Sequence, residues 1–218
     1  MQKDIFLSEG DKWFQRNRDV LVSNSKDEIT EYLQSIGKDK KVLEIGCSNG
    51  WRLELIRKQS GAACFGVEPS SKAVQDAKKR YPKISVSRGQ SHDKLKFKDE
   101  FFDVVIVSYV FHWVDRSDLL STIAGIDRVL KPFGNLIIRD FDPGMRCKVR
   151  YHHLKHDEVY TYKQPYWNIF SESGIYSEIY SKEIDHEFKE VFDLNNKTRL
   201  VVLEKRGDSN YVEIGRKF

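Results

Sequence analysis

Two apolar segments of this sequence each carry an acidic residue at or next to their end, and a glycine-bearing turn follows the first. The first, Lys41–Ile45, contains Glu44 and leads into the turn Gly46–Gly50, and the second follows about twenty residues later and ends in Glu68. Glycines let a backbone approach a nucleoside closely, and an acid after the second strand of an α/β protein can accept hydrogen bonds from two ribose hydroxyls. The spacing therefore predicts a nucleoside pocket at the ends of two strands.

The segments around this pattern alternate between strand and helix. The run 104–107 is apolar on both faces, which is typical of a central parallel strand. Strands are expected at Lys41–Ile45, Ala63–Val67, Ile84–Ser87, Phe102–Ser108, Asn135–Arg139, Ile175–His186 and Arg199–Lys205, and helices at residues 5–22, Trp51–Gln59, Ser71–Arg80 and Ser117–Leu130. We expect an α/β fold with a Rossmann-like, doubly wound sheet of about seven strands, mostly parallel with an antiparallel edge.

The 218 residues are expected to form a single domain, 1–218. Its four parts are an N-terminal helical lid, a ligand-binding core, an insert after the fifth strand and C-terminal edge strands, at residues 1–37, 38–141, 142–174 and 175–218. Within the first part, the capping-box pattern Ser25–Glu28 predicts the start of a helix that ends at Gly37.

Composition narrows the partners that we expect. The 37 basic and 33 acidic residues are interleaved and leave a net charge of +4, which argues against a nucleic-acid partner. No apolar run approaches the ~20 residues of a membrane span. Cys47, Cys64 and Cys147 lack disulfide or metal spacing, so we expect reduced thiols, a cytoplasmic protein and no metal. We expect a monomer or a homodimer.

Acidic and small polar residues recur where the predicted strands end. In open α/β sheets the ligand lies beyond the carboxyl ends of the strands, at the point where the strand order reverses. The residues at or just after four such ends are Glu44, Gly46, Glu68, Gln90, Ser91 and Ser108. Their recurrence indicates one shared binding site.

This arrangement resembles the class I S-adenosylmethionine-dependent methyltransferases over roughly residues 40–140. Glu44–Gly50 is similar to the family's first motif, an acid followed by G-x-G-x-G, with Ser48 in place of the middle glycine. That replacement suits the motif if position 48 does not need a positive φ. The segments Gly89–Asp93, Asp99–Val105 and Leu130–Gly134 are similar to the family's later loops.

The resemblance implies S-adenosylmethionine as the cofactor. Glu68 would bind the ribose, Pro69 would lie against adenine, and Gln90 with Ser91 would contact the adenine as well. The implied contacts from the core are Glu44, Gly46, Cys47, Ser48, Gly50, Glu68, Pro69, Gln90, Ser91, His92, Ser108 and Tyr109.

Segments outside the core resemble a subgroup whose genes often sit with surface-polysaccharide biosynthesis. They are Ser8–Asn17, Tyr151–His153 and Tyr162–Phe170. The resemblance implies that three residues form a lid over the methionine end of the cofactor, namely Trp13, Arg16 and Asn17. The alternative is that Trp13 only packs its helix onto the sheet.

Methyl transfer to a hydroxyl needs a group that accepts the proton. His112 follows the fourth predicted strand, Asp140 follows the fifth, and His152 and His153 lie in the insert, so these four are the candidate catalytic residues. The alternatives are that His112 packs beneath the next helix and that Asp140 caps a loop. His152 and His156 would share one helical face, but no nearby acid completes a metal site.

The function that we expect is S-adenosylmethionine-dependent methyl transfer to a small-molecule acceptor, such as a sugar or polysaccharide precursor. A regulatory protein that binds the cofactor without catalysis is one alternative. Nucleic-acid methylation is another, although no base-flipping motif of the Asn/Asp-Pro-Pro-Tyr/Phe type follows the fourth strand. A nicotinamide dinucleotide fold would need G-x-G-x-x-G, which is absent.

Overall fold

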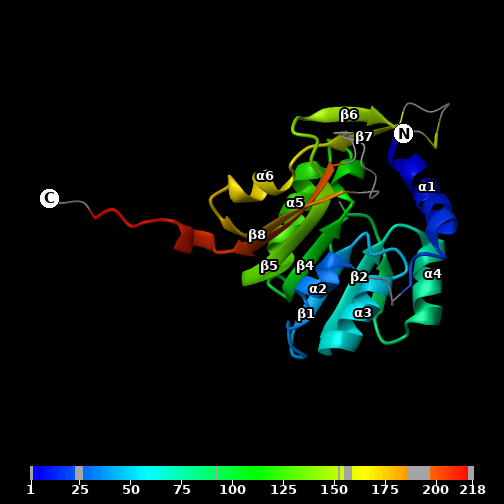
Figure 1. Cartoon of the computed structure of the whole chain (residues 1–218), viewed down its shortest axis with the longest axis horizontal. Helices are drawn as coiled ribbons and strands as arrows, with labels where there is room; N and C mark the ends of the chain where they lie inside the picture. Colours follow the sequence, from blue (N-terminus) through cyan, green and yellow to red (C-terminus); the bar gives the residue numbers. More distant parts are fainter. Residues whose placement is uncertain are drawn as a thin grey trace.

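A computed structural model describes residues 2–22, 27–91, 93–151, 153–154, 159–185 and 197–215 (Figure 1). Seven strands form one sheet in the order β3-β2-β1-β4-β5-β9-β8. They are β1 Lys41–Ile45, β2 Ala63–Glu68, β3 Ser85–Arg88, β4 Phe102–Ser108, β5 Leu130–Phe141, β8 Tyr176–Asp185 and β9 Lys197–Lys205. Strands β1 to β5 pair in parallel, whereas β9 runs antiparallel to both of its neighbours. The predicted Rossmann-like sheet with an antiparallel edge is confirmed.

Helices cover both faces of this sheet. They are α2 Glu28–Tyr32, α3 Trp51–Ser60 and α4 Ser71–Arg80 on one face, and α5 Leu119–Val129 and α6 Trp167–Ser171 on the other. Strand β4 is buried on both sides because Val105 packs with the α5–α6 core and Ile106 with the α2–α3–α4 core. Two apolar cores therefore fix the sheet and, with it, the edge where the parallel strands end.

Two segments lie over one end of the sheet. They are α1 Gln2–Asn17 and the antiparallel hairpin of β6 Cys147–Arg150 with β7 Tyr160–Lys163. In Figure 1, α1 lies beside this hairpin and above α4. Short 3-10 turns at η1 Phe111–Trp113 and η2 Gly207–Asn210 complete the described elements. None of the described helices has the length and apolar character needed to cross a membrane.

The N-terminal helices differ from their predicted bounds. Helix α1 ends at Asn17 rather than at residue 22, and α2 stops at Tyr32, well before Gly37. The side chain of Asp27, not Ser25, caps α2, accepting the Thr30 N–H at 3.1 Å. Ser25 itself lies outside the described residues. The capping box placed the helix start correctly to within two residues but assigned the cap to the wrong side chain.

Strand β5 also begins earlier than predicted, at Leu130. A register shift between Phe102 and Val104 lets Leu130 pair with Phe102, so that the predicted turn 130–134 lies within the strand. Phe133 takes φ 60° there. Helix α5 is correspondingly shorter than predicted and runs only from Leu119 to Val129.

Candidate cofactor and acceptor site

The glycine turn after β1 is held in a left-handed backbone. Gly46 has φ 72° and Gly50 has φ 73°, and a Cβ atom added at Gly46 would lie 2.4 Å from Cγ2 of Val110. Ser48 also takes a positive φ, 50°. The expectation that position 48 does not need a positive φ is therefore wrong. An L-residue in this region costs roughly 1–2 kcal/mol. The turn therefore keeps its shape in spite of Ser48.

Glu68 holds this turn through its buried carboxylate. Oε2 accepts the Ser48 N–H at 2.8 Å, and Oε1 accepts the Ser70 N–H at 2.8 Å. Burial raises the pKa of Glu68 to about 7, although these two hydrogen bonds act in the opposite direction. Each carboxylate oxygen keeps a second lone pair. Glu68 can thus support the turn and still accept ribose hydroxyls, and its contact with ribose stays a prediction.

A pocket of about 250 Å³ lies next to Glu68. Its lining includes Pro69, Arg88, Gly89, Gln90 and Asp93. The Gln90 N–H donates to Asp93 Oδ2 at 2.7 Å, which fixes the loop after β3. The structure brings Pro69 and Gln90 to one pocket, as an adenine site requires, and it adds Asp93, which was not among the predicted contacts. Ser91 follows Gln90 and is half-buried, and His92 lies outside the described residues.

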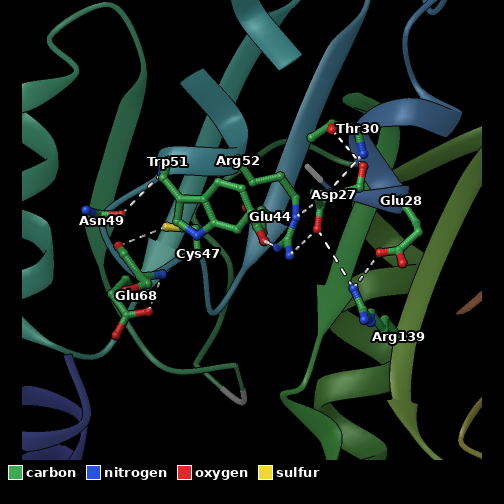
Figure 2. A network of polar contacts seen from close by, with 11 residues as sticks. Asp27, Glu28, Thr30, Glu44, Cys47, Asn49, Trp51, Arg52, Glu68 and Arg139 are labelled. Atoms are coloured by element: carbon green, nitrogen blue, oxygen red, sulfur yellow. Dashed lines mark hydrogen bonds and ion pairs between the residues drawn. The ribbon is translucent and has the colours of Figure 1, made fainter. Parts of the chain in front are cut away.

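A buried network of ion pairs joins Asp27, Arg52 and Glu44 next to the turn that follows β1 (Figure 2). Arg52, in the first turn of α3, donates to both oxygens of Asp27 at 2.9 and 3.0 Å and also to Oε1 of Glu44. Arg139 extends the network by donating to Glu28 at 3.0 Å. Asp27 and Arg52 were not among the predicted site residues. A helix-capping acid and an arginine 25 residues apart carry no local signal of their pairing.

The pKa values of the two carboxyl groups in this network shift in opposite directions. Burial disfavours ionisation of Asp27, but the charge and hydrogen bonds of Arg52 outweigh it and lower the pKa of Asp27. Burial raises the pKa of Glu44, and Arg52 offsets this only in part. Despite its own burial, Arg52 has a raised pKa because two carboxylates face it. The guanidinium is therefore a permanent cation that Asp27 and Glu44 share.

Three buried polar atoms at the strand ends lack a partner in the described part of the chain. They are Oε2 of Glu44, Oγ of Ser48 and Oγ of Ser108, from the ends of β1 and β4. Buried polar atoms are normally hydrogen-bonded, so three orphans in one region fit a bound group that carries donors. The ammonium and hydroxyl groups of S-adenosylmethionine satisfy that requirement.

Cys47 packs inside the turn rather than serving chemistry. A Cβ atom on Gly66 would lie 2.4 Å from Sγ of Cys47, so the thiol occupies the space that glycine leaves. Burial raises the pKa of the Cys47 thiol far above its usual range. A thiol in this state is a poor nucleophile. Cys47 thus closes the turn against β2, and its contact with the cofactor stays a prediction.

The candidates His112 and Asp140 form one buried pair. Nδ1 of His112 lies 2.8 Å from Oδ1 of Asp140, and the His112 backbone N–H lies 3.3 Å from Oδ2. An ionised carboxylate only accepts, so Nδ1 carries the proton and Nε2 keeps a lone pair. The ring of Phe141 lies edge-on to His112 at 4.9 Å. This is the arrangement of an oriented base, built where β4 and β5 end.

Tyr109 contacts both the ion network, through Arg139, and the surroundings of His112, through Phe141. It follows β4 with φ 56°, and its N–H donates to the Arg139 carbonyl at 2.7 Å. Its ring lies 5.2 Å from the Arg139 guanidinium and 5.6 Å from Phe141. Tyr109 therefore lies between the ion network on one side and the His112 pair on the other.

Helix α1 is fastened to both sides of the strand edge. Asp11 accepts from the Ser70 hydroxyl at 2.6 Å and from the Lys72 N–H at 3.1 Å, which binds α1 to the start of α4. At the other side, Arg16 and the Tyr151 hydroxyl both donate to the buried Glu9. The predicted cover of the site by α1 and the insert is thus present in the contacts of the structure.

The three predicted lid residues differ in their surroundings. Arg16 bonds to Glu9 and Tyr151, whereas Asn17 donates to the carbonyl of Trp13 at 2.8 Å, and Trp13 is 38% exposed. Their contact with the cofactor stays a prediction. Glu9 was missed because nothing in a helical sequence distinguishes an acid that will face an insert 142 residues away.

Of the two candidate histidines in the insert, the structure describes only His153. His153 is exposed and its ring contacts Tyr151 at 5.3 Å, while His152 is outside the described residues. Tyr151 in turn contacts Trp113 edge-on at 4.6 Å. Among the residues that the structure describes, no group of three or more His, Cys, Asp or Glu side chains could hold a metal ion.

Comparisons with known proteins relate part of this chain to a methyltransferase family. Residues 43–138 match the methyltransferase domain family. The chain is 35% identical over 106 residues to an uncharacterized methyltransferase of Synechocystis sp., covering 49% of each protein. It is 26% identical over 148 residues to the tRNA N(3)-methylcytidine methyltransferase trm140 of Schizosaccharomyces pombe, covering 63% of this chain and 48% of that one. The chain spans about half the length of these relatives.

The solved structure of a SAM-dependent methyltransferase from Methanosarcina mazei shares the fold, with a TM-score of 0.66 and 18% identity over 84% of this chain and 98% of that one. The fold is that of the class I S-adenosylmethionine-dependent methyltransferases, and residues 43–138 match their methyltransferase domain. This match supports S-adenosylmethionine as the cofactor. The polysaccharide subgroup finds no support in the comparisons.

Proposed function

We propose that this protein methylates a hydroxyl group of a small molecule. The buried His112–Asp140 pair carries the proposal, because a hydroxyl acceptor must lose a proton whereas a carboxylate acceptor has none to lose. A sugar or polysaccharide precursor is the class of acceptor that we favour. It offers hydroxyls, and it follows from the resemblance of residues 8–17, 151–153 and 162–170 to the polysaccharide subgroup.

The roles of the residues follow from their contacts. Asp140 fixes the ring of His112 and stabilises its positive charge, and Nε2 takes the acceptor's proton. Tyr109 and Phe141 pack around the imidazole and limit the entry of water. When bound, S-adenosylmethionine supplies the methyl group for an in-line displacement. The chain must therefore align the acceptor and hold the proton acceptor beside it.

On the cofactor side, we assign each group of S-adenosylmethionine to residues whose contacts are described above. Glu68 receives the ribose, the pocket of Pro69 and Gln90 receives adenine, and the free oxygen of Glu44 receives the ammonium group. Isothermal titration with S-adenosylhomocysteine tests this assignment directly. The predicted single domain, cytoplasmic location and monomeric or homodimeric state remain proposals of the same kind.

A screen of hydroxylated acceptors, with S-adenosylhomocysteine formation as the readout, tests the activity. We expect turnover on at least one sugar or sugar nucleotide and its loss in His112→Ala. The second candidate function is a regulatory protein that binds the cofactor without catalysis. Cofactor binding with no product from any acceptor would favour that candidate over methyl transfer.

A further inference from the structure

The positive charge of this chain is concentrated around the edge strand β3. Residues 72–98 contain nine basic and only two acidic residues, a local charge of +7, while the whole chain carries only +4. The rest of the protein is therefore net acidic. A net charge averaged over the chain conceals this asymmetry, which matters because a charged partner responds to the local field.

All nine basic side chains are exposed, and they come from three neighbouring elements. Helix α4 buries Ala73, Val74 and Ala77 against the sheet and turns its basic residues outward. Strand β3 forms the edge of the sheet, and the loop that follows it carries further lysines. We call this surface the β3 basic face, defined by the exposed Lys and Arg side chains of residues 72–98.

A hollow of about 420 Å³ opens within the β3 basic face. Lys78 of α4, Ser85 and Ser87 of β3, and the rings of Phe65 and Phe97 are among the residues that line it. Lys96 and Lys98 flank Phe97 in the sequence and are exposed. The hollow thus brings α4 and the loop after β3 together around partly exposed aromatic rings.

Three lysines at or near the hollow are not neutralised by the chain. Among the described residues, Lys78, Lys96 and Lys98 form no ion pair, whereas Arg80 is paired with Asp76 at 3.0 Å. Exposed unpaired ammonium groups can neutralise the phosphates of a nucleic acid and release the cations condensed on it. The β3 basic face therefore favours a partner that carries several negative charges.

We propose that the β3 basic face binds single-stranded nucleic acid. Its phosphates would lie along Lys78, Lys96 and Lys98, and an unpaired base would enter the hollow and stack against Phe97. Cations beside an exposed aromatic ring are the features that hold single strands without sequence preference. An acidic protein or an anionic membrane would bind the same cations, but neither would supply a flat base to fill the hollow beside Phe97.

Fluorescence anisotropy with a labelled single-stranded RNA, and with its DNA counterpart, tests the proposal. We expect binding whose logarithmic affinity falls with the logarithm of salt, with a slope of about −2 from three phosphate contacts. The variant K78E/K96E/K98E should bind at least tenfold more weakly and lose most of this slope. The matched control K38E/K58E/K182E alters three exposed lysines elsewhere and should change affinity far less.

Three outcomes would overturn the proposal. Equal loss of affinity in both triple variants would mean that only net charge matters. Inorganic polyphosphate that competes as strongly as an oligonucleotide of the same charge would show that the hollow takes no base. Tighter binding to anionic vesicles or to polyglutamate would assign the face to another partner. Titration of S-adenosylhomocysteine into K78E/K96E/K98E should give wild-type affinity, which separates this inference from the proposed activity.

Discussion

His112 and Asp140 lie 28 positions apart in the sequence, yet Nδ1 of the imidazole is 2.8 Å from Oδ1 of the carboxylate. The contact exists because β4 and β5 are parallel neighbours whose carboxyl ends meet at one edge. Asp140 is fully buried, and its Oδ1 also accepts the Phe141 N–H at 2.8 Å. The carboxylate is thus fixed before any ligand binds, and the imidazole is fixed by it.

Replacing His112 tests the role of this pair. We expect His112→Ala to lower kcat by about 100- to 10,000-fold, the usual contribution of a general base. Affinity for S-adenosylhomocysteine should stay within twofold of wild type, since His112 contacts the acceptor side. Steady-state kinetics measures the change in kcat, and calorimetry measures the affinity for S-adenosylhomocysteine. A variant that keeps full kcat would remove His112 from the chemistry.

Glu68 makes cofactor binding dependent on pH. Its pKa is raised to about 7, and only the ionised carboxylate presents four lone pairs to its donors. We therefore expect the Kd for S-adenosylhomocysteine to rise as pH falls from 8 to 6, and Glu68→Gln to bind weakly but without this trend. Calorimetry across that pH range gives the answer. A wild-type affinity that is flat with pH would contradict the assignment.

The same group also shapes stability. The folded pKa of about 7 exceeds the unfolded value of 4.5, so the folded state binds more protons between these values. The contribution of Glu68 to stability is present below pH 4.5 and is lost as pH rises through 7, by about 3 kcal/mol. Urea unfolding of Glu68→Gln should lack this loss. A wild-type stability that rises across the interval relative to the variant would oppose the prediction.

Arg52 is expected to be the most costly single residue to remove from the ion network. Arg52→Gln leaves Glu44 buried without its cation and leaves Asp27 with only the more distant Arg139, at 3.9 Å, which should cost about 3–5 kcal/mol in urea unfolding. The double variant D27N/R52Q should cost less than the sum of its single changes, because the uncompensated charge of Asp27 is gone. Simple additivity of the two changes would show that the pair does not act as a unit.

Ser48 offers a test of backbone strain. Its φ of 50° suits glycine, and its Oγ has no partner among the described residues. Ser48→Gly should therefore stabilise the protein by about 1 kcal/mol. Ser48→Ala keeps the Cβ atom and should change stability little, so it serves as the control. A destabilised glycine variant would mean that the hydroxyl makes a contact worth more than the strain.

The sheet could be predicted because each of its strands has a recognisable local sequence pattern. The apolar run at 104–107 is buried on both faces, and Glu44 and Glu68 lie at the carboxyl ends of β1 and β2. His112 and Asp140 were each identified from their place after a strand. Their mutual contact required the register of two strands, which no single segment encodes.

Other features depend on distant pairings or on local exceptions. The Asp27–Arg52–Glu44 network joins three elements, and the β6–β7 hairpin lies in a segment with weak periodicity. The positive φ at Ser48 runs against residue preference, because Glu68 and the packing of Gly46 impose it from outside. The charge of the β3 basic face was hidden by the balance of the whole chain. The long-range pairings and the backbone strain belong to tertiary structure, whereas this charge can be counted in the local sequence.

Binding of S-adenosylhomocysteine, measured by isothermal titration, tests the central claim most directly. The account predicts one site per chain in the wild-type protein and a loss of about 1–3 kcal/mol in Glu68→Ala, because charged-acceptor hydrogen bonds to the ribose are removed. Absence of binding by the wild-type protein, or an affinity unchanged in Glu68→Ala, would contradict the assignment of the strand edge as the cofactor site.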